Sequence, residues 1–210
     1  MENILIIGAH FDDSELGVGG TAARLVAEGK NVYKITLTDT EVFSDDMNLS
    51  ITHESCIRDS ARACEVLGVR ELEFSVSPYG ELKFTKELMQ ELEKLISKYE
   101  IDTVFMQHHD DFNSDHVFGY QLCKTAARHC KNLYTYQSNG YILEEPFEPN
   151  FFVDISDYVE KKKEALAAYQ SAHNRQEGRL FQMNIERNSV WGYGNHVSYA
   201  EGFHVIKSII

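Results

Sequence analysis

Apolar runs alternate with amphipathic stretches along the first half of the chain, and this pattern predicts an α/β fold. Residues 4–7 form a short apolar run bounded by Gly8, which is typical of a buried parallel strand. A helix is expected over residues 21–28, ending at Gly29, and a second strand over residues 32–38. Strand, helix and strand in succession make a βαβ unit, which crosses over with a right-handed sense.

The same alternation continues toward the C-terminus. Further helices are expected at residues 51–67, 85–99 and 115–130, and from an N-cap at Ser156 to about Tyr169. Further strands are expected at residues 72–76, 103–106, 133–136 and 151–155, with a loop at 144–150 and irregular structure over the binding site at 171–194. The predicted fold class is therefore α/β: a three-layer, Rossmann-like fold with a mostly parallel sheet and helices on both faces. Binding sites in such sheets lie at the carboxyl ends of the strands.

Length and composition narrow the class of protein without identifying a ligand. A chain of 210 residues has room for one core, so a single domain spanning residues 1–210 is expected. The formal net charge of −13 argues against nucleic acid and anionic membrane surfaces as partners. No apolar run reaches the roughly 20 residues of a membrane helix. The N-terminus lacks the basic region of a signal peptide, so a cytoplasmic protein is predicted.

The cysteines show no CxxC spacing, which disfavours a cysteine zinc site. They fall in segments expected to be helical, and each pair is spaced to share one helix face. Buried, reduced thiols are therefore expected at Cys56, Cys64, Cys123 and Cys130.

The segment after the first predicted strand carries metal-competent side chains, followed by glycines. His10, Asp12 and Asp13 come first, and three glycines lie within residues 17–20. A dinucleotide-binding loop needs glycines directly after the strand, and the two carboxylates would repel a pyrophosphate, so nucleotide binding is the weaker alternative. Adjacent carboxylates at the end of a buried strand are costly unless they are paired or bind a cation. Two interpretations of this segment stay open: a metal site that includes His10 and Asp13, or a structural loop in which Asp12 caps the next helix.

A second dense group of such side chains follows the strand predicted at residues 103–106. Residues 107–116 contain three histidines and three aspartates. The carboxyl ends of parallel strands open on the same edge of a sheet, so the two segments can meet over one ion. The ligands would be His10, Asp13 and one histidine of the second segment. Two imidazoles and a carboxylate with an open fourth position are the ligand set of catalytic zinc.

These motifs resemble those of the PIG-L/LmbE-like metal-dependent N-deacetylases, which act on N-acetylglucosaminyl compounds. The family's AHPDDE motif corresponds to residues 9–15 and the glycines that follow, and its HxDH or NxDH motif corresponds to residues 113–116. Weaker likeness at residues 63–69, 154–171 and 199–203 extends the resemblance over nearly the whole chain. The resemblance implies an LmbE-like fold and a hydrolase that removes an acyl group, acetyl above all, from an amino-sugar conjugate.

Carried over residue by residue, the resemblance implies that His10, Asp13 and His116 hold the metal and that Asp12 is the general base. Asp115 corresponds to a carboxylate that supports the neighbouring histidine. Zn²⁺ is the expected ion, although Fe²⁺, Co²⁺ and Mn²⁺ also suit this ligand set.

Two residues depart from the family's motifs. Phe11 replaces a proline, which affects the rigidity of the loop more than its chemistry. Asn113 replaces a histidine that in much of the family stabilises the oxyanion or protonates the leaving amine. An amide donates a hydrogen bond but transfers no proton at neutral pH, so Asn113 is expected to assist the oxyanion while Asp12 acts as base and then as acid. Other candidates for the acid are His108, His109 and His196.

Substrate contacts and assembly are the least constrained expectations. Contacts with the substrate are predicted for Arg58, His109, Trp191 and His196; Trp191 stands in a Gly-rich stretch suited to holding a sugar ring. Similar proteins commonly form oligomers, so a homo-oligomer is compatible with the resemblance. The alternatives are a nucleotide-binding protein of the same fold, and a family member that acts on a different amide or binds metal without catalysis.

Overall fold

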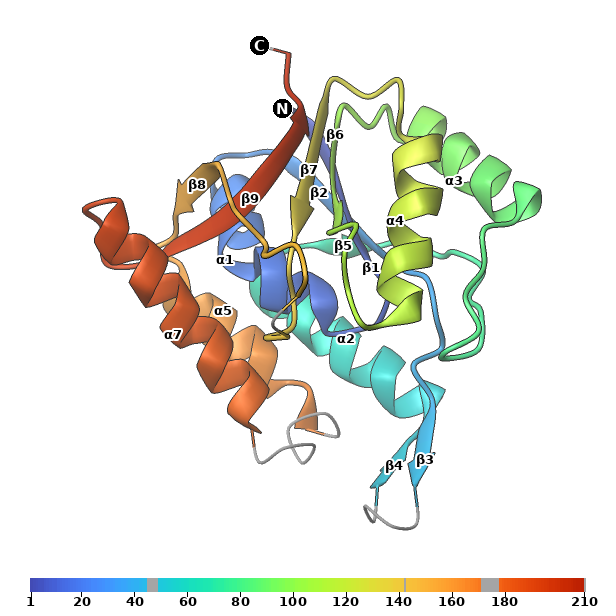
Figure 1. Cartoon of the computed structure of the whole chain (residues 1–210), viewed down its shortest axis with the longest axis horizontal. Helices are drawn as coiled ribbons and strands as arrows, with labels where there is room; N and C mark the ends of the chain where they lie inside the picture. The colour runs from blue at the N-terminus through green and yellow to red at the C-terminus, as the bar shows by residue number, and fades with distance from the viewer. Residues whose placement is uncertain (45–48, 142, 171–177, 210) are drawn as a thin grey trace.

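A seven-stranded sheet forms the centre of the protein in the computed structural model, which describes residues 1–44, 49–141, 143–170 and 178–209 (Figure 1). Its strand order is β5-β2-β1-β6-β7-β9-β8. These strands are β1 (Asn3–Gly8), β2 (Asn31–Thr36), β5 (Arg70–Glu71), β6 (Thr103–Gln107), β7 (Asn132–Tyr136), β8 (Phe151–Asp154) and β9 (Ala200–Lys207). The pairs from β5 to β7 are parallel, whereas β9 runs antiparallel to both β7 and β8. The mostly parallel α/β fold predicted from the sequence is thereby confirmed.

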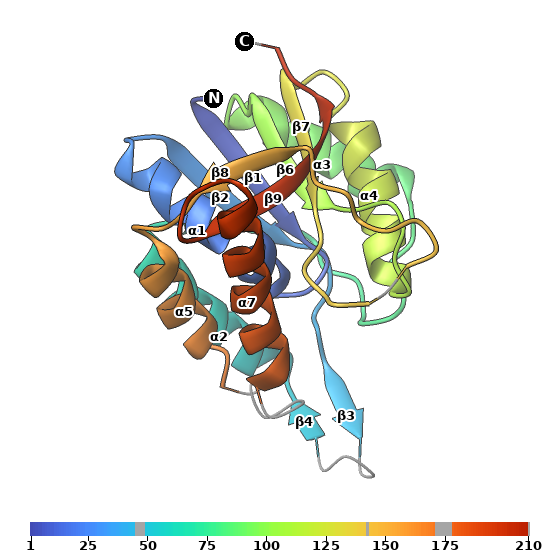
Figure 2. The same ribbon diagram turned by 60° about the vertical axis from the view of Figure 1, so that its left-hand side comes forward.

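Helices cover both faces of this sheet, as Figures 1 and 2 show. One face carries α3 and α4, which contact each other, and the other carries α1, α2, α5 and α7. A separate hairpin, β3 (Val42–Ser44) with β4 (Leu49–Ile51), extends away from the body. The helices are α1 (Asp13–Ala27), α2 (His53–Leu67), α3 (Lys86–Lys98), α4 (Ser114–Ala126), α5 (Val159–Ala167) and α7 (Arg179–Gly194).

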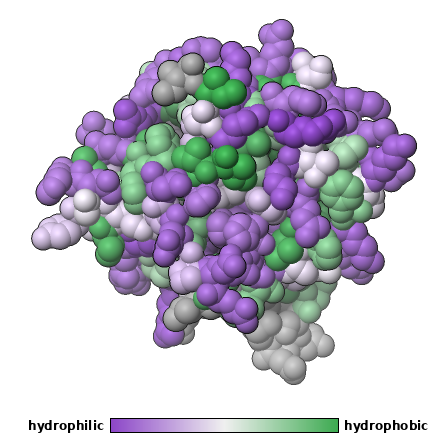
Figure 3. All heavy atoms as spheres, turned by 45° about the horizontal axis from the view of Figure 1, so that its top comes forward, coloured by the Kyte–Doolittle hydropathy of each residue, from purple (hydrophilic) through white to green (hydrophobic). Residues whose placement is uncertain are grey.

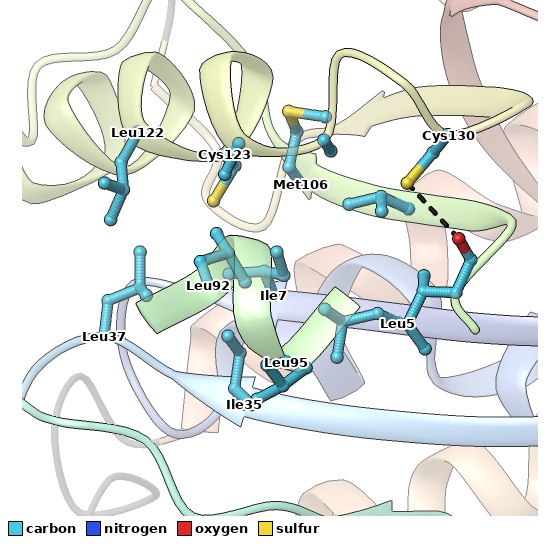
Figure 4. Packing of buried hydrophobic residues seen from close by; sticks show 14 of the residues in the cluster. Leu5, Ile7, Ile35, Leu37, Leu92, Leu95, Met106, Leu122, Cys123 and Cys130 are labelled. Atoms are coloured by element: carbon cyan, nitrogen blue, oxygen red, sulfur yellow. Dashed lines mark hydrogen bonds between the residues drawn. The ribbon is translucent and has the colours of Figure 1, made fainter. Parts of the chain in front are cut away.

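Alternate residues of the central strands enter two different cores, because successive side chains of a strand point to opposite faces. Leu5 and Ile7 of β1 pack under α3 and α4 with Leu92 and Leu122 (Figure 4). The intervening Ile4 and Ile6 of β1 pack under α1 on the other face. All four cysteines are free and buried, as predicted. No helix among the described residues is long and apolar enough to cross a bilayer, and hydrophilic side chains predominate on the face drawn in Figure 3.

The glycine-rich segment after β1 is helical, which corrects the expectation of a loop there and of a helix starting at residue 21. A Cβ atom on Gly17 would lie 2.0 Å from the ring of Tyr136, and one on Gly20 would lie 2.7 Å from Ile155. These glycines therefore allow α1 to pack closely on β7 and on the start of the α5 region. The helix is also anchored at mid-length, because the Glu201 carboxylate accepts hydrogen bonds from the amides of Gly20 and Thr21.

Several element boundaries differ from those predicted. The strand expected at 72–76 is reduced to β5, followed by one parallel bridge between Thr38 and Ser77. The helix expected from Ser156 begins at Val159, since the Ser156 hydroxyl instead donates to Asp154 and accepts from the amide of Ser198. Helix α4 ends at Ala126 rather than at residue 130.

The C-terminal region was the least well predicted. Residues 179–194, expected to be irregular, form α7, whereas residues 171–177 lie outside the described part of the chain. Strand β9 was not predicted at all, although residues 200–203 of it are buried within the sheet. The helix that precedes β9 is α7, which was itself expected to be irregular, so the βα alternation that located the other strands was broken at this point.

Strand order places a topological switch point at β1. The chain passes from β1 to β2 on one side, and β6 lies on the other side of β1. The segments that follow β1 and β6 therefore leave the sheet next to each other, and the crevice between them is where such folds bind ligands.

Candidate metal centre

Three buried side chains converge at this switch point. His10 follows β1, Asp13 begins α1, and His116 lies in the first turn of α4. One ligand atom from each of the three lies within 4.8 Å of the others. The Nδ1 of His10 is 3.2 Å from the Nε2 of His116, and Oδ2 of Asp13 is 3.4 Å from each of these nitrogens. The fold thus brings together the three residues that were predicted as metal ligands.

The outer nitrogen of each histidine faces a carboxylate. Nε2 of His10 is 3.2 Å from Asp115 Oδ2, and Nδ1 of His116 is 2.8 Å from Asp111 Oδ2. Because an ionised carboxylate only accepts hydrogen bonds, these outer nitrogens carry the protons. The inner nitrogens, which face each other and Asp13, are then the ones that can offer lone pairs to a metal ion. Three acceptors at this spacing need a positive charge between them, so the donor set fits a divalent cation.

The sequence had led us to expect that Asp115 supports the neighbouring His116, but its carboxylate contacts His10 instead. Its carboxylate supports His10 and also accepts hydrogen bonds from the amides of Gly80 and Leu82, at 2.7 and 3.1 Å. The residue that supports His116 is Asp111, which sequence analysis did not select. The signal was present in the three aspartates of residues 107–116, but adjacency in sequence pointed to the wrong one. On a helix, neighbouring side chains point about 100° apart, so Asp115 and His116 face different partners.

The carboxylates around the centre are themselves held in place. Oδ1 of Asp13 accepts a hydrogen bond from the Ser138 hydroxyl at 2.7 Å, and Asp111 accepts one from the amide of Asn139 at 2.6 Å. Both partners lie in the segment after β7. Arg187 of α7 fixes this segment, because its guanidinium donates to the carbonyl groups of Gln137 and Asn139. Helix α7 therefore holds in place the segment that hydrogen-bonds the carboxylates of Asp13 and Asp111.

Burial and neighbouring charges shift the pKa values of the site in different directions. Burial and the charge of Asp13 raise the pKa of Asp12. Burial alone would lower the pKa of His116, but Asp13 and Asp111 outweigh it and raise the value to about 10. Burial would raise the pKa of Asp13, but the charges and hydrogen bonds of the two histidines hold it well below its usual range. The carboxylates therefore favour positive charge at the centre, whether a proton or a metal ion carries it.

Asp12 and Asn113 border the same pocket as the three ligands. Asp12 occupies the N-cap position of α1, but its side chain accepts no capping hydrogen bond there. The side chain of Asn113 caps α4, where its Oδ1 accepts from the amide of Asp115 at 2.9 Å. This contact leaves the Nδ2 of Asn113 as the donor available to the pocket.

The backbone at Phe11 is restrained even though this residue replaces a proline of the family motif. Its carbonyl oxygen accepts hydrogen bonds from Lys34 Nζ and from the hydroxyl of Tyr169, both at 2.7 Å. Lys34 is buried and also pairs with Glu15 at 2.9 Å. A buried network thus fixes the loop conformation between His10 and Asp12.

The pocket above the centre has a volume of about 390 Å³, which is within the usual range for small-molecule sites. Its other walls include Tyr79, Tyr169, the segment after β7 and the first turns of α7. None of the four predicted substrate residues lines it. Arg58 has a side chain that is 57 % exposed and pairs with Asp59, His109 packs on His108 and Tyr120, Trp191 packs on Phe147 and Phe152, and His196 is exposed beyond α7.

Comparison with known proteins identifies relatives of this chain. Residues 5–127 match the family model described as PIG-L, GlcNAc-PI de-N-acetylase. The diacetylchitobiose deacetylase of Thermococcus kodakarensis is 26 % identical over 230 aligned positions, which cover all of this chain and 85 % of that protein.

Two solved structures show how widely the fold is used. The conserved protein TT1542 of Thermus thermophilus aligns with a TM-score of 0.81 and 26 % identity, covering 100 % of this chain and 97 % of that one. GalB of Pseudomonas putida KT2440, a 4-carboxy-2-hydroxymuconate hydratase, aligns with a TM-score of 0.79 and 18 % identity. The alignment covers 100 % of this chain and 98 % of GalB. The second likeness concerns the fold alone.

Proposed function

The chain belongs to the PIG-L family, and from that premise we propose that it is a metal-dependent hydrolase that removes an N-acetyl group from an amino sugar or its conjugate. The observation that carries this proposal is the convergence of two imidazole lone pairs and a carboxylate beside the pocket. We take residues 1–210 as one catalytic domain and a small molecule as its partner.

His10, Asp13 and His116 are the residues that would hold the ion. A divalent cation there supplies a Lewis acid that lowers the pKa of water and polarises an amide carbonyl. Zn²⁺ is our first choice, because two imidazoles and one carboxylate are a ligand set of catalytic zinc. Fe²⁺, Co²⁺ and Mn²⁺ suit the same ligands and are the alternatives.

Asp12 would transfer the proton, and Asn113 would stabilise the negative charge that develops on the carbonyl oxygen. The Asp12 carboxylate takes a proton from the attacking water, whose oxygen bonds to the carbonyl carbon of the amide. Nδ2 of Asn113 donates a hydrogen bond to the carbonyl oxygen as it becomes negatively charged. The C–N bond then breaks, Asp12 returns the proton to the departing amine, and acetate and the free amino sugar leave.

The histidines named as alternative acids are poorly placed for this role. His108 is buried and its Nδ1 contacts Thr135, while His109 and His196 are exposed and do not line the pocket. Burial keeps the pKa of Asp12 raised. A carboxyl with a raised pKa is suited to accept and return a proton in one cycle.

The test is acetate release by protein reloaded with one metal at a time after chelation. N-acetylglucosamine, N,N′-diacetylchitobiose and a nucleotide sugar serve as substrates, with an N-acetylated amine that carries no sugar as the control. We expect acetate and free amine in equal amounts from at least one sugar. His10→Ala and His116→Ala should lose the metal in elemental analysis. Metal-loaded protein that releases no acetate from any sugar would overturn the assignment and leave a hydrolase of another amide, or a metal-binding protein without catalysis, as the candidates.

A further inference from the structure

Two aromatic rings stand exposed beside the pocket. Phe112 directly precedes Asn113 and is 71 % exposed, and Tyr141, which lines the pocket, is 53 % exposed. Their ring centroids are 5.9 Å apart with planes at 78°, an edge-to-face arrangement. Together the two exposed rings form a small apolar surface suited to contact with a ligand. We call Phe112 and Tyr141 the aromatic rim.

The aromatic rim is tied to the metal centre. Phe112 follows Asp111, which holds His116, while Tyr141 donates its backbone amide to the side chain of Asn139 at 3.3 Å. The Asn139 amide in turn donates to Asp111 at 2.6 Å. The two loops that carry the rings are therefore joined to each other and to a metal ligand. The rim has a fixed position relative to the reacting centre, as a substrate subsite requires.

We propose that the aromatic rim binds a second pyranose ring, attached to the sugar that carries the amide. A pyranose presents an apolar C–H face that packs flat on an aromatic ring, with its hydroxyls directed outward. The net charge of −13 favours a neutral occupant over a phosphate or carboxylate. The rim continues the wall formed by Asn113 and Gly140, so one chain of sugars would cover both. The subsite deepens the proposed function and rests on it, since it makes a disaccharide or longer conjugate the preferred substrate.

The test compares a monosaccharide with a disaccharide. The measured quantity is the ratio of kcat/KM for N,N′-diacetylchitobiose to that for N-acetylglucosamine. Phe112→Ala and Tyr141→Ala should each lower this ratio about tenfold, mainly through KM of the disaccharide. Tyr141→Phe, which keeps the ring, should retain most of the ratio. Tyr193→Ala is the matched control, because Tyr193 is 87 % exposed at the far end of α7 and should leave the ratio unchanged.

Isothermal titration of chitobiose and glucosamine into the metal-free protein separates the subsite from the reaction. If chitobiose binding weakens in Phe112→Ala while the metal-loaded wild type turns over neither acetylated sugar, the subsite is supported and the deacetylation is overturned. Turnover with the same ratio in wild type and both alanine variants would overturn the subsite and keep the deacetylation. A third substrate, N-hexanoylglucosamine, identifies the occupant. If its kcat/KM, rather than that of the disaccharide, depends on Phe112, the rim binds an acyl chain and the proposal is wrong.

Discussion

Nδ1 of His116 lies 2.8 Å from Oδ2 of Asp111, five residues earlier in the chain. This contact fixes the imidazole so that its other nitrogen faces His10 and Asp13. It also makes the ring a stronger base and therefore a better metal ligand. The site thus depends on a carboxylate that does not touch the metal position.

Asp111→Asn should lower metal affinity about 10-fold to 100-fold, because an amide in this position removes the charge that orients and strengthens His116. Competition with a chromophoric chelator measures the affinity. Asp110→Asn is the control, since the side chain of Asp110 accepts from the backbone of Glu145 instead of from a ligand histidine. Equal affinities for the two variants would mean that Asp111 has only a structural role.

Asp12→Asn should retain the metal and lose about 10²-fold to 10⁴-fold in kcat, the usual contribution of a general acid–base group. The metal ligands and their supporting carboxylates are unchanged in this variant. Elemental analysis and acetate release, measured on the same sample, test the two halves of the statement. Loss of metal together with activity would place Asp12 among the ligands, and full activity would remove it from the mechanism.

The sequence predicted the ligands better than their supports, for a physical reason. His10, Asp13 and His116 follow from two segments at adjacent strand ends, which the βα alternation located. The choice between Asp111 and Asp115 depends instead on how the first turn of α4 is oriented, and sequence spacing does not reveal this.

Long-range packing explains the other differences between the expected and the observed fold. The glycines of α1 suggested a loop, and only the close approach of Tyr136 and Ile155 shows why a helix needs them. Arg187 acts from α7 on a loop 48 to 50 residues away in sequence. No local pattern in the chain marks such a contact.

Metal binding should release a proton at neutral pH. The pKa of His116 in the metal-free protein is raised to about 10, so this ring is protonated at pH 7 and a metal must displace the proton. The raised pKa stabilises the metal-free fold fully below the unfolded-state value of 6.5, and this stabilisation is lost as the pH rises through about 10. Metal should therefore raise Tm by an increasing amount across that window. Calorimetry in buffers of different ionisation enthalpy counts the released protons, and a count of zero at pH 7 would contradict the assignment.

Glu201→Gln should destabilise the protein by about 3–5 kcal/mol, because it leaves the buried ammonium of Lys162 without its counter-charge. The two groups are 2.6 Å apart and both side chains are fully buried, and Glu201 also accepts the two amides in the middle of α1. Burial already lowers the pKa of Lys162. A folded protein that binds fewer protons than its unfolded chain gains stability as the pH rises, so the deficit of the variant should narrow toward about pH 10.

The matched control for this prediction is Glu160→Gln, which breaks the Lys163–Glu160 pair on the exposed face of the neighbouring turn. The side chain of Lys163 is 40 % exposed and that of Glu160 is 80 % exposed, so solvent screens the pair. The free energy of unfolding should therefore fall by less than about 0.5 kcal/mol. Urea unfolding of both variants at two pH values measures the difference. If Glu201→Gln lost no more stability than the control, the buried pair would contribute specificity of packing rather than stability. If its deficit did not change with pH, Lys162 would keep its proton in the variant, and the charge would have found another partner.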